Sequence, residues 1–246
     1  MSNPMMIYFP FGGRGELSRL AAAAGGVELD ESPENDGTVP DMPSRNQKKL
    51  PLPLAAPFAA LVCCPSPGVA GANFVCVVAV PGSFFGALPT LKHGDVELCQ
   101  SQAITMYLGE IGPKFAGLAA GHKGVDAMYT GILEDVLAGC AGVVFGDHST
   151  AGEVVPAHLN KFFTVVEGML PASGFINGLD FPTIADCAVL CMTDMMVPIG
   201  IAMQLAGGYD LAPFPKMLAI SSATKASPEV AAYLAKSATL TAMPKM

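Results

Sequence analysis

The hydrophobic and polar positions follow different spacings in the two halves of the chain. The first half holds short apolar runs, among them residues 7–11 and 69–80, bounded by glycines and prolines. In the second half apolar residues recur at spacings of three and four: Val125, Met128, Tyr129, Ile132, Leu133, Val136, Leu137 and Cys140, then Val154, Leu159, Phe162, Phe163, Val166 and Leu170. Short runs predict strands, and the longer spacing predicts amphipathic helices. We therefore expect an α/β first half and an all-helical second half.

A strand, a loop and a helix open the chain. The apolar run at residues 7–11 breaks at Gly12 and Gly13, and a helical segment follows from about Gly15 to the glycines at 25 and 26. Tyr8 lies late in the predicted strand, and Arg14 lies at the start of the predicted helix. Such units are among the commonest local structures, and a tyrosine placed like this is more often a packed residue than a catalyst.

The spacing of this opening resembles that of the sigma-type cytosolic glutathione transferases. Their first strand and helix read roughly Tyr-Phe-x-x-x-Gly-Arg-x-Glu-x-x-Arg. The pattern is matched without a gap by Tyr8, Phe9, Gly13, Arg14, Glu16 and Arg19. In the same order as in that family, the resemblance continues over residues 85–110 and, more loosely, over residues 124–236.

A proline-led hairpin and a helix lie in the second region of resemblance. Leu88 and Pro89 precede a strand, a turn at residues 93–95 and a second strand, and Gln100 with Ser101 then opens a helix over residues 101–108. In thioredoxin-like folds the corresponding proline is cis and exposes the backbone of the preceding residue to a bound peptide. A trans proline in an ordinary turn is the alternative. Free N–H groups and a hydroxyl at a helix start favour a carboxylate, although serine there is also an ordinary cap.

In the helical half, residues that typically begin helices lie at the positions where helices begin in this family. Thr183 and Asp186 form a Thr-x-x-Asp capping signal, and Pro215 and Pro228 each stand in the first turn of a predicted helix. The resemblance thus implies an α/β thioredoxin-like N-terminal domain at residues 1–111 and an all-α C-terminal helical bundle domain at residues 118–246.

An uncharged stretch from residue 50 to residue 91 interrupts the first domain. Its apolar runs, residues 55–64 and 69–80, are each shorter than the roughly 20 residues of a membrane-spanning helix. Residues 54–82 are either an inserted surface segment or translated non-coding sequence, and their low-complexity composition favours the second interpretation. A transcript that encodes these residues continuously would refute it.

The resemblance implies a glutathione transferase that activates the glutathione thiol as a thiolate for conjugation to small hydrophobic electrophiles, or for peroxide reduction or isomerisation. A free thiol has a pKa of about 8.5, and a Tyr8 hydroxyl that donates to the sulfur would lower it, with Arg14 adding positive charge. The family's other glutathione contacts fall on Leu88 and Pro89 for the cysteinyl amide, Gln100 and Ser101 for the γ-glutamyl group, Lys48 or Lys49 for the glycyl carboxylate, and Asp126 of the partner subunit.

The last of these contacts implies a homodimer, and a solvated acid at a helix start is the alternative for Asp126. The chain has no tryptophan, a residue that the family uses at the glycyl end. The alternative function is therefore a non-catalytic protein of the same fold, which binds ligands or serves as a structural subunit.

The net charge and the cysteine and histidine content limit the partners and metals that the protein is expected to bind. The formal net charge is -8, from 13 basic and 21 acidic residues, which disfavours nucleic acid and anionic membranes as partners. Seven cysteines without a CxxC pair, and four histidines without an HxxxH pair, give no zinc motif, so we expect glutathione as a co-substrate and no metal. The first residues show no secretory signal, and the expected location is the cytoplasm.

Overall fold

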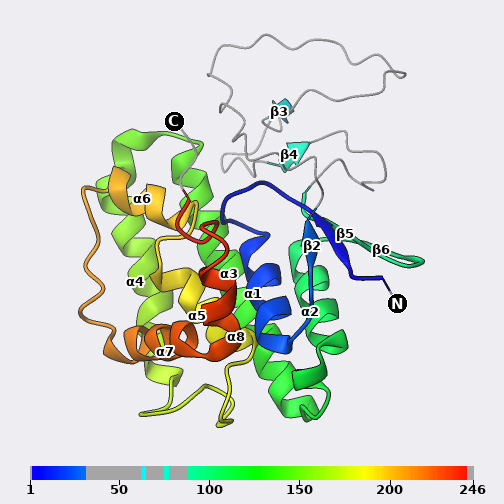
Figure 1. Ribbon diagram of the computed structural model, residues 1–246. Coiled ribbons are helices and arrows are strands. Elements are labelled where there is room, and N and C mark those ends of the chain that lie inside the picture. Colours follow the sequence, from blue (N-terminus) through cyan, green and yellow to red (C-terminus); the bar gives the residue numbers. More distant parts are fainter. Residues whose placement is uncertain (1, 32–61, 65–74, 78–87, 243–246) are drawn as a thin grey trace.

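The computed structural model describes residues 2–31, 62–64, 75–77 and 88–242 (Figure 1). The elements in chain order are β1 (Met5–Ile7), α1 (Glu16–Gly25), β2 (Asp30–Glu31), β3 (Val62–Cys64), β4 (Val75–Val77), β5 (Thr90–His93), β6 (Val96–Cys99), α2 (Ser101–Ile111), η1 (Pro113–Phe115), α3 (Ala120–Val144), η2 (His148–Thr150), α4 (Ala151–Met169), α5 (Ile184–Thr193), α6 (Ile199–Leu205), α7 (Pro215–Ala226) and α8 (Pro228–Leu234).

Four of the strands form a mixed sheet in the order β2-β1-β5-β6. β1 and β2 are parallel and are joined through α1, whereas β5 is antiparallel to both β1 and β6. Ile7 pairs with Thr90, and Thr90 pairs with Cys99. The end of β1, the start of β5 and the end of β6 therefore lie at one edge of the sheet. β3 and β4 form a separate antiparallel pair.

Helix α1 lies between the sheet and the helical half of the molecule (Figure 1). Ala22 packs with Met6, Leu91 and Ile104 in a core cluster on the sheet side, whereas Leu20 belongs to the larger core of the helical half. Because α1 is covered on both sides, nearly all of its residues are buried, including the polar Glu16, Ser18 and Arg19. The two predicted halves of the chain thus share α1 as a common packing element.

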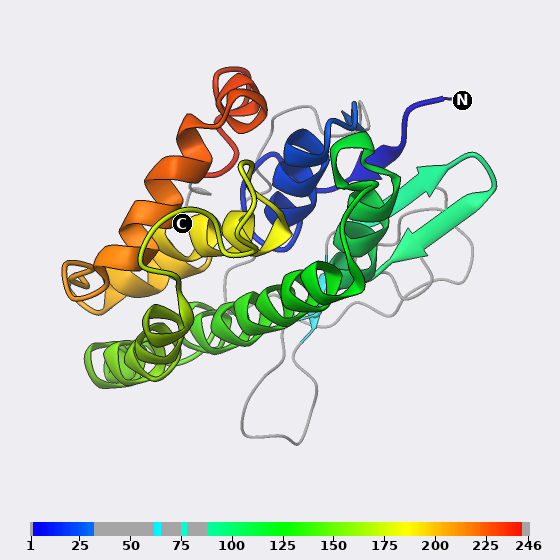
Figure 2. The same ribbon diagram turned by 90° about the horizontal axis from the view of Figure 1, so that it is seen from below.

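The helical half is organised along α3, which packs against α4, α5 and α6, and Figure 2 shows it running along the length of this half. By length and composition alone α3, with 25 residues, could cross a membrane. Its inward face, with Tyr129, Leu133, Val136 and Cys140, is buried in the core. A core helix meets the same composition test, so we infer no membrane span.

Several element boundaries confirm the expectations from the sequence. The predicted stop of α1 is made by Gly26, whose φ of 75° lets its N–H reach the carbonyls of the last turn. The hairpin turns at Gly94, with φ of 60°. The capping box at the start of α5 is present: the Thr183 hydroxyl accepts from the backbone of Asp186, and the Asp186 carboxylate accepts from the backbone of Thr183. The predicted fold class is confirmed.

The connections that follow α1 and α2 are set by local contacts. The Val27 N–H closes the end of α1 by bonding to the Ala22 carbonyl, and β2 begins only at Asp30. The short helix η1 lies between the end of α2 and the start of α3. Close approach of Gly112 to Gly25 holds this connection against α1, where an added Cβ would lie 3.1 Å from the Gly25 Cα.

Candidate functional site

Three of the predicted site segments meet at one edge of the sheet. Because Ile7, Thr90 and Cys99 are neighbours in the register, the residues just beyond them also come together. These residues are Tyr8 after β1, Pro89 before β5, and Gln100 after β6. The sheet alone thus brings together residues that are more than 80 positions apart in the sequence.

Tyr8 is 7 % exposed, and its ring is held on several sides. The Arg19 guanidinium lies 5.6 Å from its ring centroid, and the Phe9 ring lies at 5.3 Å in an edge arrangement. Its hydroxyl lies against Gly13, where an added Cβ would be 2.8 Å from the hydroxyl oxygen and where φ is 94°. Tyr8 therefore directs its hydroxyl toward the turn that leads into α1.

The backbone before β5 has the geometry that the sequence predicted. The Leu88–Pro89 peptide bond is cis, Pro89 is buried, and Leu88 is half-buried against the same core cluster as Tyr8. A proline at the first residue before a strand removes no ladder hydrogen bond. The cis alternative, rather than a trans proline in an ordinary turn, is therefore the one found.

Gln100 stands immediately before α2 in an uncommon backbone conformation. Its φ is 72° and its ψ is 113°, and φ above zero is rare for residues other than glycine. Its side chain is exposed, while Ser101 begins the helix and is half-buried. An exposed polar side chain next to a helix N-terminus, on backbone that costs energy to hold, is typical of a ligand site.

Arg14 lies at the mouth of α1 and faces α3. Its Nε donates to Glu134 Oε1 at 2.5 Å, and the two side chains are 39 % and 26 % exposed. A shallow hollow between α1, α2 and α3 is lined by both, together with Gly13, Ser101 and other residues of these helices. The structure therefore brings Arg14 and Ser101 to one hollow and places Tyr8 beside it through Gly13.

Glu134 was missed by the sequence reasoning. It lies on α3 between the buried positions Leu133 and Val136, at the border of the helix's inward face. An acid at such a border can turn toward a neighbouring helix, and this pattern was the one available signal. Its ion pair fixes where the Arg14 charge lies.

Lys48 lies outside the described residues, so its predicted role at the glycyl end remains a prediction. The same is true of the segment at residues 54–82 apart from β3 and β4. Among the residues that the structure does describe, no three His, Cys, Asp or Glu side chains are grouped so that they could hold a metal ion.

The surroundings of Asp126 contradict the expected role of this residue as a glutathione contact of the partner subunit. It is 1 % exposed, and its Oδ1 accepts hydrogen bonds from Thr183 Oγ1 at 2.6 Å, from the Ala185 N–H at 2.9 Å and from Asn177 Nδ2 at 3.2 Å. Burial raises the pKa of Asp126, and the three hydrogen bonds lower it in part. A carboxylate enclosed in this way cannot reach glutathione on a second subunit. It joins α3 to the start of α5 instead.

Asp186 is a second buried acid at the start of α5. Its oxygens accept from the N–H groups of Ile176 at 2.9 Å and Thr183 at 2.8 Å. Burial, with a smaller contribution from the nearby Asp126, raises the pKa of Asp186 to about 6 against the lowering effect of these bonds. The pair of acids stabilises the helix start and lies away from the sheet edge that gathers Tyr8.

Comparison with known proteins agrees with this architecture. Residues 134–237 match the family model described as glutathione S-transferase, C-terminal domain. A glutathione S-transferase structure from Caenorhabditis elegans is similar with a TM-score of 0.62 at 23 % identity, covering 96 % of this chain and 99 % of that one. The chain has the glutathione transferase fold.

Two further solved structures show the same transferase fold. The structure of rat hPGDS complexed with a quinoline has a TM-score of 0.62 at 15 % identity and covers 96 % of this chain and 98 % of that one. Monomeric Na-GST-3, a glutathione S-transferase from the hookworm Necator americanus, has a TM-score of 0.60 at 17 % identity, with 96 % and 97 % covered. The comparison with curated protein sequences gave no match. At these sequence identities the structural similarity establishes the fold, whereas the chemistry depends on the residues of the site.

Proposed function

We propose that the protein is a glutathione transferase of the sigma-like class, which conjugates the glutathione thiol to small hydrophobic electrophiles. The observation that carries the proposal is the position of Tyr8. Its hydroxyl lies against Gly13, beside the edge of the sheet where the cis Leu88–Pro89 bond and the start of α2 meet. A tyrosine that served only as packing would not need a hydroxyl directed at this junction.

Tyr8 would act on the sulfur of bound glutathione. A free thiol with a pKa of about 8.5 is only a few per cent thiolate at neutral pH. A hydroxyl that donates a hydrogen bond to the sulfur stabilises the charged form and lowers that pKa. The nucleophile is then the thiolate, which forms a carbon–sulfur bond to the electrophile while the leaving group departs with its electron pair.

The remaining contacts would hold the tripeptide in place. Gln100 and Ser101 at the start of α2 would bind the γ-glutamyl group, where free helix N–H groups favour a carboxylate. The backbone of Leu88, which precedes the cis Pro89, would pair with the cysteinyl amide. Lys48 would contact the glycyl carboxylate. Asp126 takes no part in this set.

Arg14 would supply a positive charge near the sulfur, moderated by Glu134. Nε of Arg14 is engaged by Glu134, and Arg14 lines the same hollow as Ser101. A half-exposed ion pair contributes little to stability, typically about 0–1 kcal/mol. The role proposed for this ion pair is to hold the Arg14 side chain in one orientation.

We further propose a glutathione-binding part at residues 1–111 and a helical part at residues 118–246, in a cytoplasmic homodimer. The fold supports the assignment of the two parts. Because one solved structure of the same fold is titled as monomeric, the assembly needs its own measurement, and light scattering at micromolar concentration would provide it.

Two assays test the function. The protein should be retained on immobilised glutathione and eluted by free glutathione, and it should conjugate 1-chloro-2,4-dinitrobenzene. Tyr8→Phe should lower kcat roughly tenfold or more, because it removes a preorganised donor from a charged reacting atom. Tyr209→Phe is the matched control, since that hydroxyl bonds to Asn160 far from the site. Tyr8→Phe activity within twofold of wild type would refute the role of Tyr8.

A further inference from the structure

A buried ion cluster lies directly beneath the turn that carries Tyr8 and Gly13. The Arg19 side chain on α1 is 1 % exposed. Its Nη1 lies 3.1 Å from Glu16 Oε2, and its Nε and Nη2 donate to the Glu31 carboxylate at 2.6 and 3.0 Å. A buried arginine of this kind is stable only when its donors are satisfied, which explains the two acids around it.

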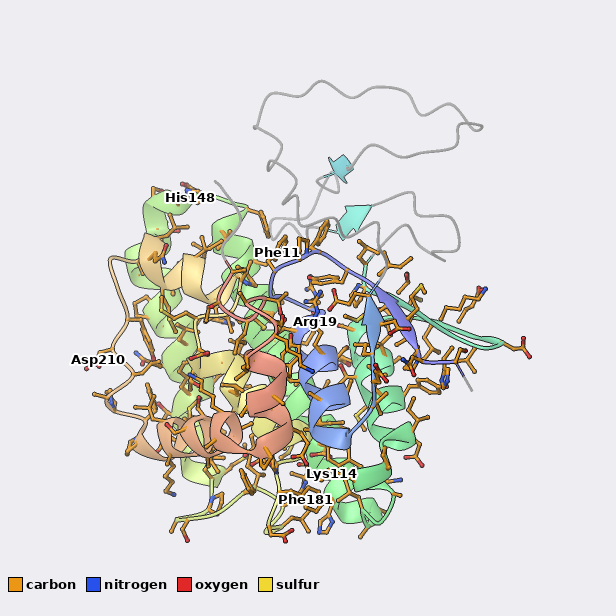
Figure 3. All side chains as sticks on the ribbon, viewed as in Figure 1. Phe11, Arg19, Lys114, His148, Phe181 and Asp210 are labelled. Carbon is orange, nitrogen blue, oxygen red and sulfur yellow. The ribbon has the colours of Figure 1, made fainter. Side chains whose placement is uncertain are left out.

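The same guanidinium holds the turn from the inside. Nη2 of Arg19 donates to the Phe9 carbonyl at 2.8 Å, and Nη1 donates to the Phe11 carbonyl at 3.1 Å (Figure 3). Both carbonyls belong to the stretch of backbone between Tyr8 and Gly12. Arg19 therefore fixes the path of the chain just after the residue proposed to act on sulfur.

The cluster continues into the C-terminal segment. The Tyr233 hydroxyl on α8 donates to Glu16 Oε1 at 2.7 Å, because a carboxylate can only accept. The hydroxyl of Thr239, 2.8 Å away, must then donate to Tyr233, and Ser237, at 2.9 Å, must donate to Thr239. Burial raises the pKa of Tyr233, so the hydroxyl stays protonated and keeps its role as donor. The hydrogen bonds form one directed chain.

The C-terminal segment also touches the turn from the outside. An added Cβ at Gly12 would lie 2.7 Å from Cγ of Met196, 3.2 Å from the Thr239 carbonyl oxygen and 3.4 Å from the Leu240 carbonyl oxygen. Leu240 itself is 2 % exposed and belongs to the larger core. Only a glycine fits at position 12, so the turn is enclosed between Arg19 on one side and residues 196 and 239–240 on the other.

We propose that Tyr233 and Thr239 are positioning residues for the Tyr8 turn, acting through Glu16 and Arg19. The C-terminal segment would set the geometry of residues 9–13 from more than 200 positions away in the sequence. This inference rests on the proposed function for its catalytic consequence, whereas the coupling itself concerns the structure alone. It predicts that removing one hydroxyl in the C-terminal segment loosens the turn and misplaces Tyr8.

The experiment uses substitutions that keep the shape of the side chain. Tyr233→Phe leaves Glu16 Oε1, which is fully buried, without its donor. Thr239→Val removes the next hydroxyl in the chain, and Thr239→Ser restores it. Tyr209→Phe removes a tyrosyl hydroxyl elsewhere in the helical half and serves as the control.

Hydrogen exchange read by mass spectrometry measures the turn directly, without reference to activity. In Tyr233→Phe the peptide that spans residues 9–16 should exchange roughly tenfold faster or more, since a hydrogen bond to a buried charged group is lost. Thr239→Val should show a smaller rise in the same peptide. Thr239→Ser and Tyr209→Phe should match the wild type there.

Kinetics then separate positioning from general destabilisation. With 1-chloro-2,4-dinitrobenzene, Tyr233→Phe should lower kcat roughly tenfold, as expected for a small misplacement of a reacting group, and leave KM for glutathione within about twofold. The midpoint of the pH–rate profile should move upward, because Tyr8 stabilises the thiolate less well. A merely structural role would lower the melting temperature without moving that midpoint.

The outcomes of the two assays are distinguishable. An unchanged exchange rate in Tyr233→Phe overturns the proposal, and so does a loss of activity that Tyr209→Phe shows equally. If the wild-type protein neither binds glutathione nor conjugates an electrophile, the proposed function fails, and the exchange rates alone decide whether the C-terminal segment holds the turn.

Discussion

Gly15 offers a sharp test of whether the position of the Tyr8 ring matters. Its backbone, with φ of -82° and ψ of -21°, suits any residue, so alanine would bring no conformational strain. The space around Gly15, however, is too small for a side chain. An added Cβ would lie 2.3, 2.6 and 2.9 Å from three carbon atoms of the Tyr8 ring. Gly15→Ala therefore acts on Tyr8 and leaves the backbone conformation acceptable.

The size of the effect follows from these distances. Carbon atoms in contact lie about 3.5–4.0 Å apart, so the Tyr8 ring has to move by at least about 1 Å. Overpacking of this kind costs roughly 1–3 kcal/mol, against a gain of up to about 1 kcal/mol from replacing glycine in a helical conformation. A displacement of about 1 Å at a reacting group can lower the rate roughly a hundredfold. The roughly hundredfold loss of rate should thus accompany a net loss of stability of no more than about 3 kcal/mol.

Thermal unfolding and glutathione conjugation, measured on the same samples, check this expectation. Gly168→Ala is the matched control, because Gly168 lies near the end of α4, is exposed and has nothing within 4 Å of an added Cβ. The control should keep its activity and gain up to about 1 kcal/mol. If Gly15→Ala were as active as Gly168→Ala, the Tyr8 ring could not be the group whose position decides the rate.

Two further predictions concern acids. The native state should bind the Asp186 proton more tightly than the unfolded chain does, since burial raises its pKa to about 6. Because of this group, the free energy of unfolding should then fall by roughly 2–3 kcal/mol between about pH 4 and about pH 7. Urea titrations at several pH values measure this fall. If Asp186→Asn showed the same dependence of unfolding free energy on pH as the wild type, the prediction would be wrong. Glu134→Gln keeps an acceptor for Arg14 and removes a negative charge beside the hollow, so the pH–rate profile of conjugation should move to lower pH; an upward shift would show that Arg14 acts only when paired.

Local sequence signals predicted the parts of the site that depend on the backbone. The glycines after β1, the proline before β5 and the polar pair after β6 each specify a turn or a helix start, and these features are set by a few neighbouring residues. The sheet register then brought Tyr8, Leu88 and Gln100 together. Nothing beyond short-range chemistry and strand order was needed for that part.

The assignment of Asp126 failed although the sequence held the information to avoid it. Asp126, Tyr129, Leu133, Val136 and Cys140 follow one another at spacings of three and four, which places Asp126 on the inward face of α3. The family position implies a glutathione contact, whereas this periodicity implies a buried carboxylate. Once it is buried, the carboxylate needs donors, and the start of α5 supplies them through Thr183 and Ala185.

The features that could not be predicted all depend on contacts between distant segments. Met196 and the Thr239 carbonyl explain why position 12 admits only glycine, yet neither is near it in the sequence. The motif residues Glu16 and Arg19 were recognised as part of a pattern, but their use as a link between the Tyr8 turn and Tyr233 is visible only in three dimensions. A matched motif therefore predicted the residues of the proposed site, while some of the contacts that enclose the turn after Tyr8 come from the other end of the chain. The C-terminal segment of this protein should accordingly be tested as a determinant of the proposed thiolate chemistry.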